Sequence, residues 1–215
     1  MKTRVPPEWV HAYICNKLRS KLKHNYFNHG FFYSEELTLL GFKSTGKNVK
    51  ISKNCTIIGC QNISIGSNTR IDDYSVITSE TGSVTIGSYV HIASHSIIVG
   101  SGGVEIDDYS GISHGVKIYS ATDDYIEGYL SNPMAPDDYR NVTKEKVFLK
   151  KFVTIGAGSI VLPGINISEG CSIGAQSLVN KNTKEWGLYH GIPARRVADK
   201  SKKIAQNFLK KGLKK

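Results

Sequence analysis

The stretch IGAGSI-VLPGIN-ISEGCS-IGAQSL, residues 155–178, divides into four units of six residues that each begin with Ile or Val. Small residues fill much of the rest, with Gly at the second position of two units and Ser or Cys at the fifth position of three. Three such units make eighteen residues, which is the separation of Ile155 from Ile173. Internal repetition at a fixed period is the signature of a stacked repeat architecture.

The same six-residue unit recurs through the first half of the chain, with Ile at its first position each time. The earlier copies are ISKNCT at 51–56, IGSNTR at 65–70, IDDYSV at 71–76, IGSYVH at 86–91, IASHSI at 92–97, IDDYSG at 106–111 and ISHGVK at 112–117. The pattern predicts a coil of short parallel strands in which each first residue points inward and stacks on its equivalent one turn away. Gly at the second position gives the backbone the freedom that a corner needs. Such a coil requires several stacked turns and capped ends.

The repeat stops after Ile118 and returns at Val153, which predicts a loop over residues 119–148 inserted at one corner of the coil. Residues 6–40 look helical and are expected to cap or flank the first turn. We therefore expect a helical cap over 1–48, the coil over 49–192 and a basic helix over 193–215.

Composition indicates a soluble globular protein of 215 residues, with 40% hydrophobic and 21% charged residues. The sequence shows neither an apolar run long enough for a membrane span nor a secretory signal, and its four cysteines form no disulfide or zinc pattern, so we expect a cytoplasmic location. The net charge of +10 is concentrated in residues 195–215, where seven Lys and two Arg face a single Asp. This basic tail is interpreted as solvated lysines on a capping helix, or as a weak contact with an anionic membrane surface or with a phosphate-bearing ligand.

The six-residue pattern resembles that of the hexapeptide-repeat acyltransferases, over residues 50–197. The most specific part is IGAGSIVLPGINISEGCSIGAQSLVNKN followed by HGIPARRV, which looks like the coenzyme A-binding end of the sugar acyltransferase branch. The resemblance implies an all-β fold, the left-handed parallel β-helix, and a homotrimer with active sites between subunits. It also implies acyl-CoA (acetyl-CoA or a longer acyl-CoA) as co-substrate, with no metal.

In this family the pantetheine arm lies along strand backbone that small side chains leave open. The matching residues are Gly156, Ala157 and Ala175, although they also suit the geometry of a corner on structural grounds alone. Basic residues beyond the last turn are expected to pair with the phosphates of coenzyme A. These residues are Lys181, Arg195 and Arg196.

The kind of acceptor is inferred from one position at which this sequence departs from the family pattern. In the sugar O-acetyltransferases a histidine serves as general base shortly after the turn that precedes the loop, and its place here falls at Asp123. A carboxylate is a weak base at neutral pH, but an amine acceptor needs only to be neutral when it attacks and loses its proton later. We therefore favour N-acylation of a nucleotide-linked amino sugar, as in enzymes of surface-polysaccharide or lipopolysaccharide biosynthesis. O-acetylation of a saccharide hydroxyl is the alternative.

The expected site combines Asp123 as catalytic residue with His95 as the alternative base. Further residues are expected to bind the acceptor, although solvated side chains, turn residues or subunit contacts explain several of them equally well. These residues are Ser79, His91, Ser101, Asp124 and Tyr125.

Two other classes fit less well. A β-helical carbonic anhydrase would bind zinc with three histidines, but His91, His95 and His114 occupy different positions of their units. In a nucleic-acid-binding protein, basic residues would be striped along one face and interleaved with aromatic ones, whereas here they are terminal.

Overall fold

The computed structural model describes residues 29–212, with side chains up to Lys210. The chain divides into two compact units, Met1–Gly30 and Phe31–Lys215, and all elements below belong to the second. The predicted helical segment before residue 29 lies outside the described residues.

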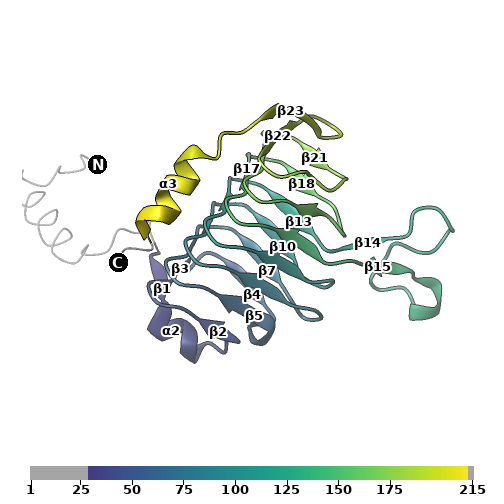
Figure 1. Cartoon of the computed structure of the whole chain (residues 1–215). Helices are drawn as coiled ribbons and strands as arrows, with labels where there is room; N and C mark the ends of the chain where they lie inside the picture. The colour runs from purple at the N-terminus through teal and green to yellow at the C-terminus, as the bar shows by residue number, and fades with distance from the viewer. Residues whose placement is uncertain (1–28, 213–215) are drawn as a thin grey trace, which may run out of the picture. The chain divides into compact units, whose positions relative to one another are not determined.

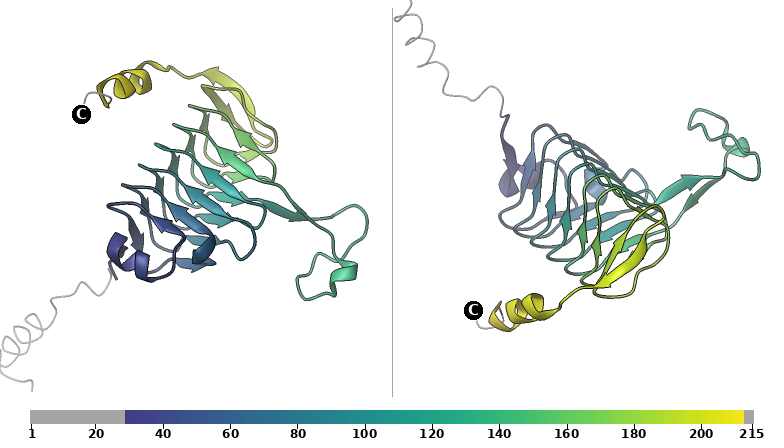
Figure 2. Two further views of the ribbon diagram at one scale, coloured as in Figure 1. Left: turned by 60° about the horizontal axis from the view of Figure 1, so that its bottom comes forward. Right: turned by 90° about the horizontal axis from the view of Figure 1, so that it is seen from above.

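The unit is a coil in which the chain passes through three parallel sheets on every turn (Figures 1 and 2). Sheet A contains β1 (Phe31–Tyr33), β3 (Lys50–Ser52), β6 (Arg70–Ile71), β9 (His91–Ile92), β12 (Gly111–Ile112), β17 (Thr154–Ile155), β20 (Ser172–Ile173), β22 (Gly187–His190) and β23 (Arg195–Asp199). Sheet C contains β4 (Thr56–Ile58), β7 (Val76–Thr78), β10 (Ile97–Val99), β13 (Lys117–Tyr119), β18 (Ile160–Val161) and β21 (Leu178–Val179). Sheet B contains β2 (Ser44–Thr45), β5 (Ile63–Ile65), β8 (Val84–Ile86), β11 (Val104–Ile106), β16 (Val147–Leu149) and β19 (Asn166–Ile167).

Stacked aliphatic residues form the core, as the repeat predicts. In sheet A, Ile71 pairs with Ile92, Ile92 with Ile112, and Ile155 with Ile173. The first residue of every quoted unit is at most 3% exposed. Burying one such side chain stabilises the fold by about 1.5–3 kcal/mol, and each turn gains this only against its neighbours. The predicted left-handed parallel β-helix is confirmed.

The turns meet at three corners, named here by the sheets they join in chain order: the AC, CB and BA corners. At the AC corner a column of serines points inward, including Ser75, Ser96, Ser159 and Ser177, each at most 2% exposed. Their hydroxyls donate to backbone carbonyl oxygens of the same or the next turn, as Ser159 does to Gly174 at 2.9 Å. Buried polar groups must be paired, which explains Ser at the fifth position of the repeat.

At both ends of the coil, the observed secondary structure differs from the predicted helices. Near the N-terminal end, Phe31–Tyr33 is a strand antiparallel to β3, and within residues 29–48 only α2 (Ser34–Leu39) is helical. At the C-terminal end, Arg195–Asp199 is strand β23, paired antiparallel with β22, so the prediction of a helix over 193–215 is wrong for this segment. The helix α3 begins at Lys203 and ends at Gly212. None of the helices in residues 29–212 is long and apolar enough to cross a membrane.

The loop predicted over 119–148 contains a two-stranded hairpin that projects from the CB corner, here called the arm (Figures 1 and 2). Its strands are β14 (Ala121–Asp123) and β15 (Val142–Lys144), and its tip carries a short helix, η2 (Asp137–Tyr139). A second short helix, η1 (Cys60–Asn62), lies at the same corner several turns earlier.

An aromatic column runs along the outside of the BA corner. Tyr89 stacks on Tyr109 with ring centroids 5.0 Å apart, and Tyr109 stacks on Phe152 at 5.2 Å. Trp186 reaches Phe152 at 6.2 Å across Gly170, where a Cβ would come within 2.3 Å of the indole. Phe208 of α3 meets Tyr109 edge-on at 5.2 Å, which fixes the C-terminal helix against the coil.

Candidate active site

The residues expected to line the pantetheine arm, here called the acyl-CoA strip, lie next to one another at the AC corner. Backbone hydrogen bonds stack Ser113 on Ile155, Gly156 on Ile173 and Gly174 on Tyr189. A Cβ on Gly156 would lie 2.5 Å from the backbone nitrogen of Ala175, so the stacking itself requires glycine at this position. Ala157 is half-buried and Ala175 is exposed, which leaves strand backbone accessible at the last turns.

The three basic residues expected to bind phosphate differ in how they are held. Lys181 and Arg195 are exposed. Arg196 instead donates to Asp199 at 2.7 Å and to the carbonyl oxygen of Lys184 at 3.0 Å. The hydrogen bonds to Asp199 and to the Tyr189 hydroxyl raise the pKa of Arg196. Its guanidinium fastens β23 to the preceding turn, and the expectation that Arg196 also binds phosphate stays a prediction.

A histidine–carboxylate pair stands on the outer face of sheet A. The Nε2 atom of His91 lies 2.8 Å from one carboxylate oxygen of Asp72, and Nε of Arg70 donates to the other at 2.5 Å. Burial raises the pKa of Asp72, but the hydrogen bonds from His91 and Arg70 outweigh it and hold the pKa below its ordinary value. Asp72 is therefore a carboxylate that fixes the orientation of the exposed His91 ring.

The structure does not bring His95 and Asp123 together within one chain. His95 lies at the AC corner between β9 and β10, exposed, with its ring 5.1 Å from that of Tyr74. Asp123 ends strand β14 on the arm, which leaves the coil from the CB corner. A site that uses both residues would need two copies of the chain.

The two serines expected to bind the acceptor lie at the CB corner. Ser101 is half-buried in its turn. Ser79 is fully buried, and its hydroxyl has no hydrogen-bond partner among the described residues. Ser79 was expected to contact a sugar, but it points into the coil, and this expectation is wrong.

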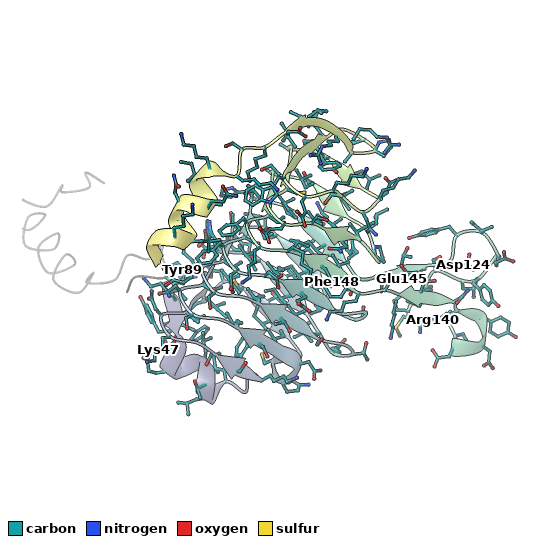
Figure 3. All side chains as sticks on the ribbon, viewed as in Figure 1. Lys47, Tyr89, Asp124, Arg140, Glu145 and Phe148 are labelled. Carbon is teal, nitrogen blue, oxygen red and sulfur yellow. The ribbon has the colours of Figure 1, made fainter. Side chains whose placement is uncertain are left out.

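Asp124 and Tyr125 are on the arm, where Figure 3 shows Asp124 and Arg140 out from the coil. One carboxylate oxygen of Asp124 accepts from the backbone nitrogens of Ile126 at 2.7 Å and Glu127 at 3.0 Å, and the other accepts from Asn141 at 3.0 Å. The backbone hydrogen bonds from Glu127 and Ile126 lower the pKa of Asp124. Asp124 thus holds the turn of the arm, while Tyr125 is 79% exposed.

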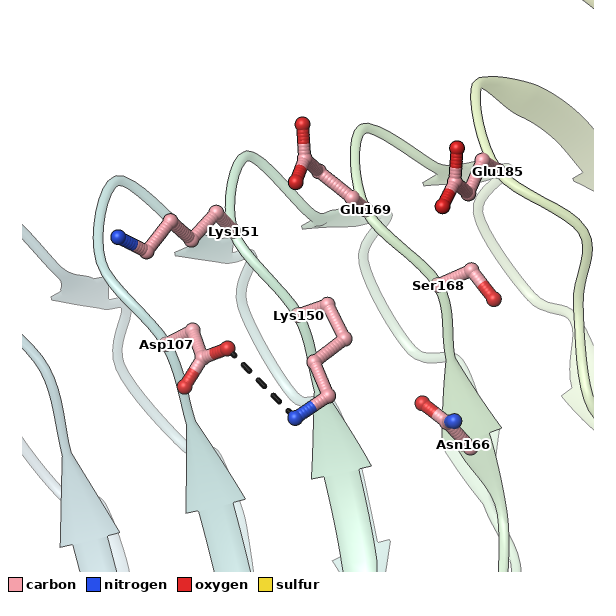
Figure 4. A pocket seen from close by; sticks show the side chains of 7 residues that line it. All are labelled: Asp107, Lys150, Lys151, Asn166, Ser168, Glu169 and Glu185. Carbon is pink, nitrogen blue, oxygen red and sulfur yellow. Dashed lines mark ion pairs between the residues drawn. The ribbon is translucent and has the colours of Figure 1, made fainter.

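A polar hollow lies on sheet B near the BA corner (Figure 4). Its lysines are paired, Lys150 with Asp107 at 3.8 Å and Lys151 with Asp108 at 3.6 Å. Glu169 and Glu185 complete its rim, so it offers no unpaired positive charge to a phosphate. Residues 29–212 contain no group of three His, Cys, Asp or Glu side chains arranged to hold a metal ion.

Comparison with known proteins places this arrangement among acyltransferases. The chain is 46% identical over 176 residues to the dTDP-4-amino-4,6-dideoxy-D-glucose acyltransferase of Escherichia coli, covering 81% of this chain and 92% of the relative. AntD, an N-acyltransferase from Bacillus cereus solved with dTDP and 3-hydroxybutyryl-CoA, is 41% identical with a TM-score of 0.80, covering 87% of this chain and 100% of AntD. A maltose O-acetyltransferase from Clostridium difficile, 22% identical with a TM-score of 0.54 over 88% of this chain and 86% of its own, shares the fold. No protein-family model matches the chain.

Solved AntD variants direct attention to one more pair of residues in this chain. They carry substitutions at an aspartate or at a serine ten residues before it, and they bind CoA together with dTDP or dTDP-4-amino-4,6-dideoxyglucose. One serine and aspartate in this chain have that spacing, Ser113 and Asp123. Ser113 fills an ordinary position of its unit, so the ten-residue spacing to Asp123 is the only sequence signal that marks it.

Proposed function

The chain belongs to the family of acyl-CoA-dependent N-acyltransferases that act on nucleotide-linked amino sugars, and from that premise we propose that it acylates the 4-amino group of a dTDP-linked 4-amino-4,6-dideoxyhexose. The observation that carries the proposal is the 46% identity over 92% of the Escherichia coli acyltransferase that bears this substrate in its name. The serine–aspartate pair at the spacing of the AntD variants supports it.

The reaction forms a carbon–nitrogen bond and breaks the carbon–sulfur bond of the thioester. The amine gives up one proton in total, and the thiolate of CoA takes one up, so the products are an amide and a free thiol. Asp123 orients the neutral amine and accepts its proton as the tetrahedral adduct forms, which is within the reach of a carboxylate for an amine but demanding for a hydroxyl. In this proposal Ser113, at the AC corner, donates a hydrogen bond to the thioester oxygen.

Acyl-CoA lies along the AC corner of the last turns. The open backbone at Ala157 and Ala175 suits the amides of the pantetheine arm. Lys181 and Arg195 supply positive charge for the nucleotide phosphates. His95 remains the second choice of base, since it lies at the same corner one turn before Ser113.

We also propose a homotrimer in which the arm of one subunit completes the AC corner of the next. Asp123 and Ser113 belong to different corners of the coil, and joining neighbouring subunits is the arrangement that unites them. In this assembly Ser101 and Tyr125 contact the acceptor at the rim. The enzyme would act in the cytoplasm, in lipopolysaccharide or related glycan biosynthesis, with the basic tail in weak contact with the membrane surface.

Thiol release from acetyl-CoA and longer acyl-CoAs tests this function. Two acceptors are compared, dTDP-4-amino-4,6-dideoxyglucose and the matched sugar with a hydroxyl at C4. Turnover confined to the amine is expected, with Asp123→Asn lowering kcat by at least about tenfold. Turnover of the hydroxyl sugar would instead support an O-acetyltransferase with His95 as its base.

A further inference from the structure

The C-terminal helix α3 leaves its large apolar side chains in contact with solvent. Ile204 is 77% exposed, Phe208 47% and Leu209 41%. Between Lys203 and Lys210 only Ala205 is half-buried, and every other residue is exposed. Three large apolar side chains on one short helix are more than the isolated exposed residues of an ordinary protein surface.

These apolar residues lie on one side of the helix. Ile204 and Phe208 are four residues apart, as are Ala205 and Leu209, and this spacing places all four in one stripe along α3. Such a stripe is stable in a folded protein when it faces an apolar medium. The coil covers only its centre, where Ala205 lies.

The polar side of α3 is basic. Residues 200–215 contain seven Lys and no Asp or Glu, which accounts for most of the net charge of +10. Among the residues with described side chains, no ion pair neutralises Lys203 or Lys210. An apolar stripe beside such lysines is typical of helices that lie in the interface of a membrane with anionic lipids. Nucleic acid would engage the lysines alone and an apolar protein surface the stripe alone, whereas a lipid surface uses both.

The described contacts between the coil and the segment that contains α3 are few. Phe208 meets Tyr109 edge-on at 5.2 Å, and the ammonium of Lys202 stands 5.7 Å from the centre of the Trp186 ring. Because Phe208 belongs to the apolar stripe, α3 cannot keep this contact and bury the whole stripe in another medium at the same time. The helix thus has two states that exclude each other.

We propose that α3 is a reversible anchor for an anionic lipid surface. In the bound state it leaves Tyr109, buries Ile204, Phe208 and Leu209 below the headgroups and places its lysines among the lipid phosphates. The inference rests on the proposed function for its setting in glycan biosynthesis, and the binding itself requires no turnover. The contact with Tyr109 seats α3 at the BA corner, on the side of the coil opposite the arm (Figures 1 and 2), so the anchor leaves the acyl-CoA strip of the AC corner uncovered.

Co-sedimentation of the full chain with lipid vesicles is the first test. Vesicles of equal parts phosphatidylglycerol and phosphatidylcholine should bind the protein, and pure phosphatidylcholine vesicles should bind it at least about tenfold less. Ile204→Ser should lower the partition coefficient for the anionic vesicles by about tenfold, and Leu209→Ser by about fivefold because Leu209 starts less exposed. Gln206→Ser, on the polar side of the same helix, is the matched control and should change it by less than about twofold.

The charge is tested separately. The double variant Lys203→Gln/Lys210→Gln should bind the anionic vesicles about tenfold more weakly and the phosphatidylcholine vesicles as the wild type does. Lys43→Gln/Lys53→Gln has the same net charge but replaces two exposed lysines near the start of the coil. This control should lose less than about threefold, and an equal loss in both double variants would mean that net charge alone attracts the protein.

Tyr109→Asn tests the release from the coil. Asn suits this corner, since Asn68 holds the equivalent position with a φ of 57° against 61° at Tyr109. Without the tyrosine ring the docked state loses its partner, so the anionic vesicles should bind this variant about threefold more tightly than the wild type. Unchanged or weaker binding would show that α3 stays on the coil.

The remaining outcomes separate the anchor from other partners and from catalysis. Loss of the native oligomer in Ile204→Ser would make the stripe a subunit contact, and binding of the wild type to single-stranded DNA but not to vesicles would make the partner nucleic acid; either result overturns the inference. All α3 variants should keep kcat and KM for soluble substrates within about twofold. Turnover of a nucleotide amino sugar without vesicle binding would remove the anchor alone, and vesicle binding without turnover would remove the proposed function alone.

Discussion

At the scale of single residues, glycines at different positions of the repeat unit have different surroundings. Gly156 is required because the backbone of Ala175 would lie 2.5 Å from a Cβ. Gly111 has open space around the same position. Gly156 is the second residue of its unit and lies at a corner, whereas Gly111 is the sixth residue of its unit and lies in strand β12.

We predict that Gly156→Ala destabilises the fold by about 2 kcal/mol, because the backbone of the next turn must move away from the added methyl group. Gly111→Ala should leave the free energy of unfolding unchanged or raise it by a few tenths of a kcal/mol, since it restricts the unfolded chain. Urea unfolding of the two variants beside the wild type checks this. Equal stability of both variants would contradict the packing argument.

Two cysteines in the first turns should be unreactive despite their partial exposure. Burial raises the pKa of Cys55 to about 11 and also raises that of Cys60. Because the thiolate is the reactive form, alkylation of Cys55 at pH 8 should be about a hundredfold slower in the folded protein than in the unfolded chain. Peptide mapping after timed iodoacetamide treatment measures each site separately, and fast labelling of native Cys55 would refute the prediction.

At the scale of elements, the arm depends on one carboxylate. The pKa of Asp124 is lower in the folded arm than its ordinary value of 3.8. Its stabilisation of the turn is therefore complete at pH values above the unfolded pKa and is lost as the pH falls through the folded one.

We accordingly predict that amide exchange in residues 121–144, corrected for its intrinsic pH dependence, stays constant from pH 7 to about 5 and accelerates below about 4. Asp124→Ala should already show fast exchange at pH 7, with the coil unaffected. Asp124→Asn, which keeps an acceptor oxygen for the two backbone nitrogens, is the matched control and should exchange more slowly than the alanine variant. Uniform exchange in all three proteins would mean that other contacts hold the arm.

The C-terminal helix depends on the aromatic column of the BA corner. Phe208 makes its edge-on contact with Tyr109, a geometry that contributes about 0.5–1.5 kcal/mol beyond burial. Phe208→Ala should increase amide exchange in Lys203–Gly212 without lowering the thermal midpoint of the coil. Gln206→Ala is a control on the same helix, and loss of protection in that variant as well would show that the helix is held by other means.

The elements also show where sequence reasoning reaches its limit. A period of six residues is enough to predict the coil, because first-position residues such as Ile92 and Ile155 have one available environment, the core. The six-residue period does not reveal that the chain reverses direction after Gly191. Because of this reversal, Arg196 holds β23 against the preceding turn. Nor does the period tell which serine of the CB corner points inward, as Ser79 does. Both depend on contacts between turns rather than on the order of residues.

At the scale of the whole molecule, the proposed active site is divided between corners. The AC corner provides Ser113 and the strip for acyl-CoA, and the arm from the CB corner provides Asp123. A single subunit would then hold two incomplete halves of a site.

This arrangement predicts complementation. When Ser113→Ala and Asp123→Asn subunits, each with strongly reduced activity, are unfolded together and refolded as mixed trimers, about a quarter of the sites should receive both intact residues and regain wild-type activity. Separately refolded variants mixed without exchange are the control. Activity no higher than that control would place both residues in the same subunit's site or outside it.

The arm enters and leaves the coil without altering its stacking. Lys117 and Ile118 before it pair in register with Ile160 and Val161, and β11 pairs in register with β16 across the inserted residues. The stacking of the coil therefore does not restrict the length or the composition of the arm. Grafting the corresponding hairpin of another acyltransferase between Tyr119 and Val147 should transfer its acceptor preference, while the donor preference stays that of the host. Related enzymes can therefore change their sugar acceptor during evolution while the coil stays the same.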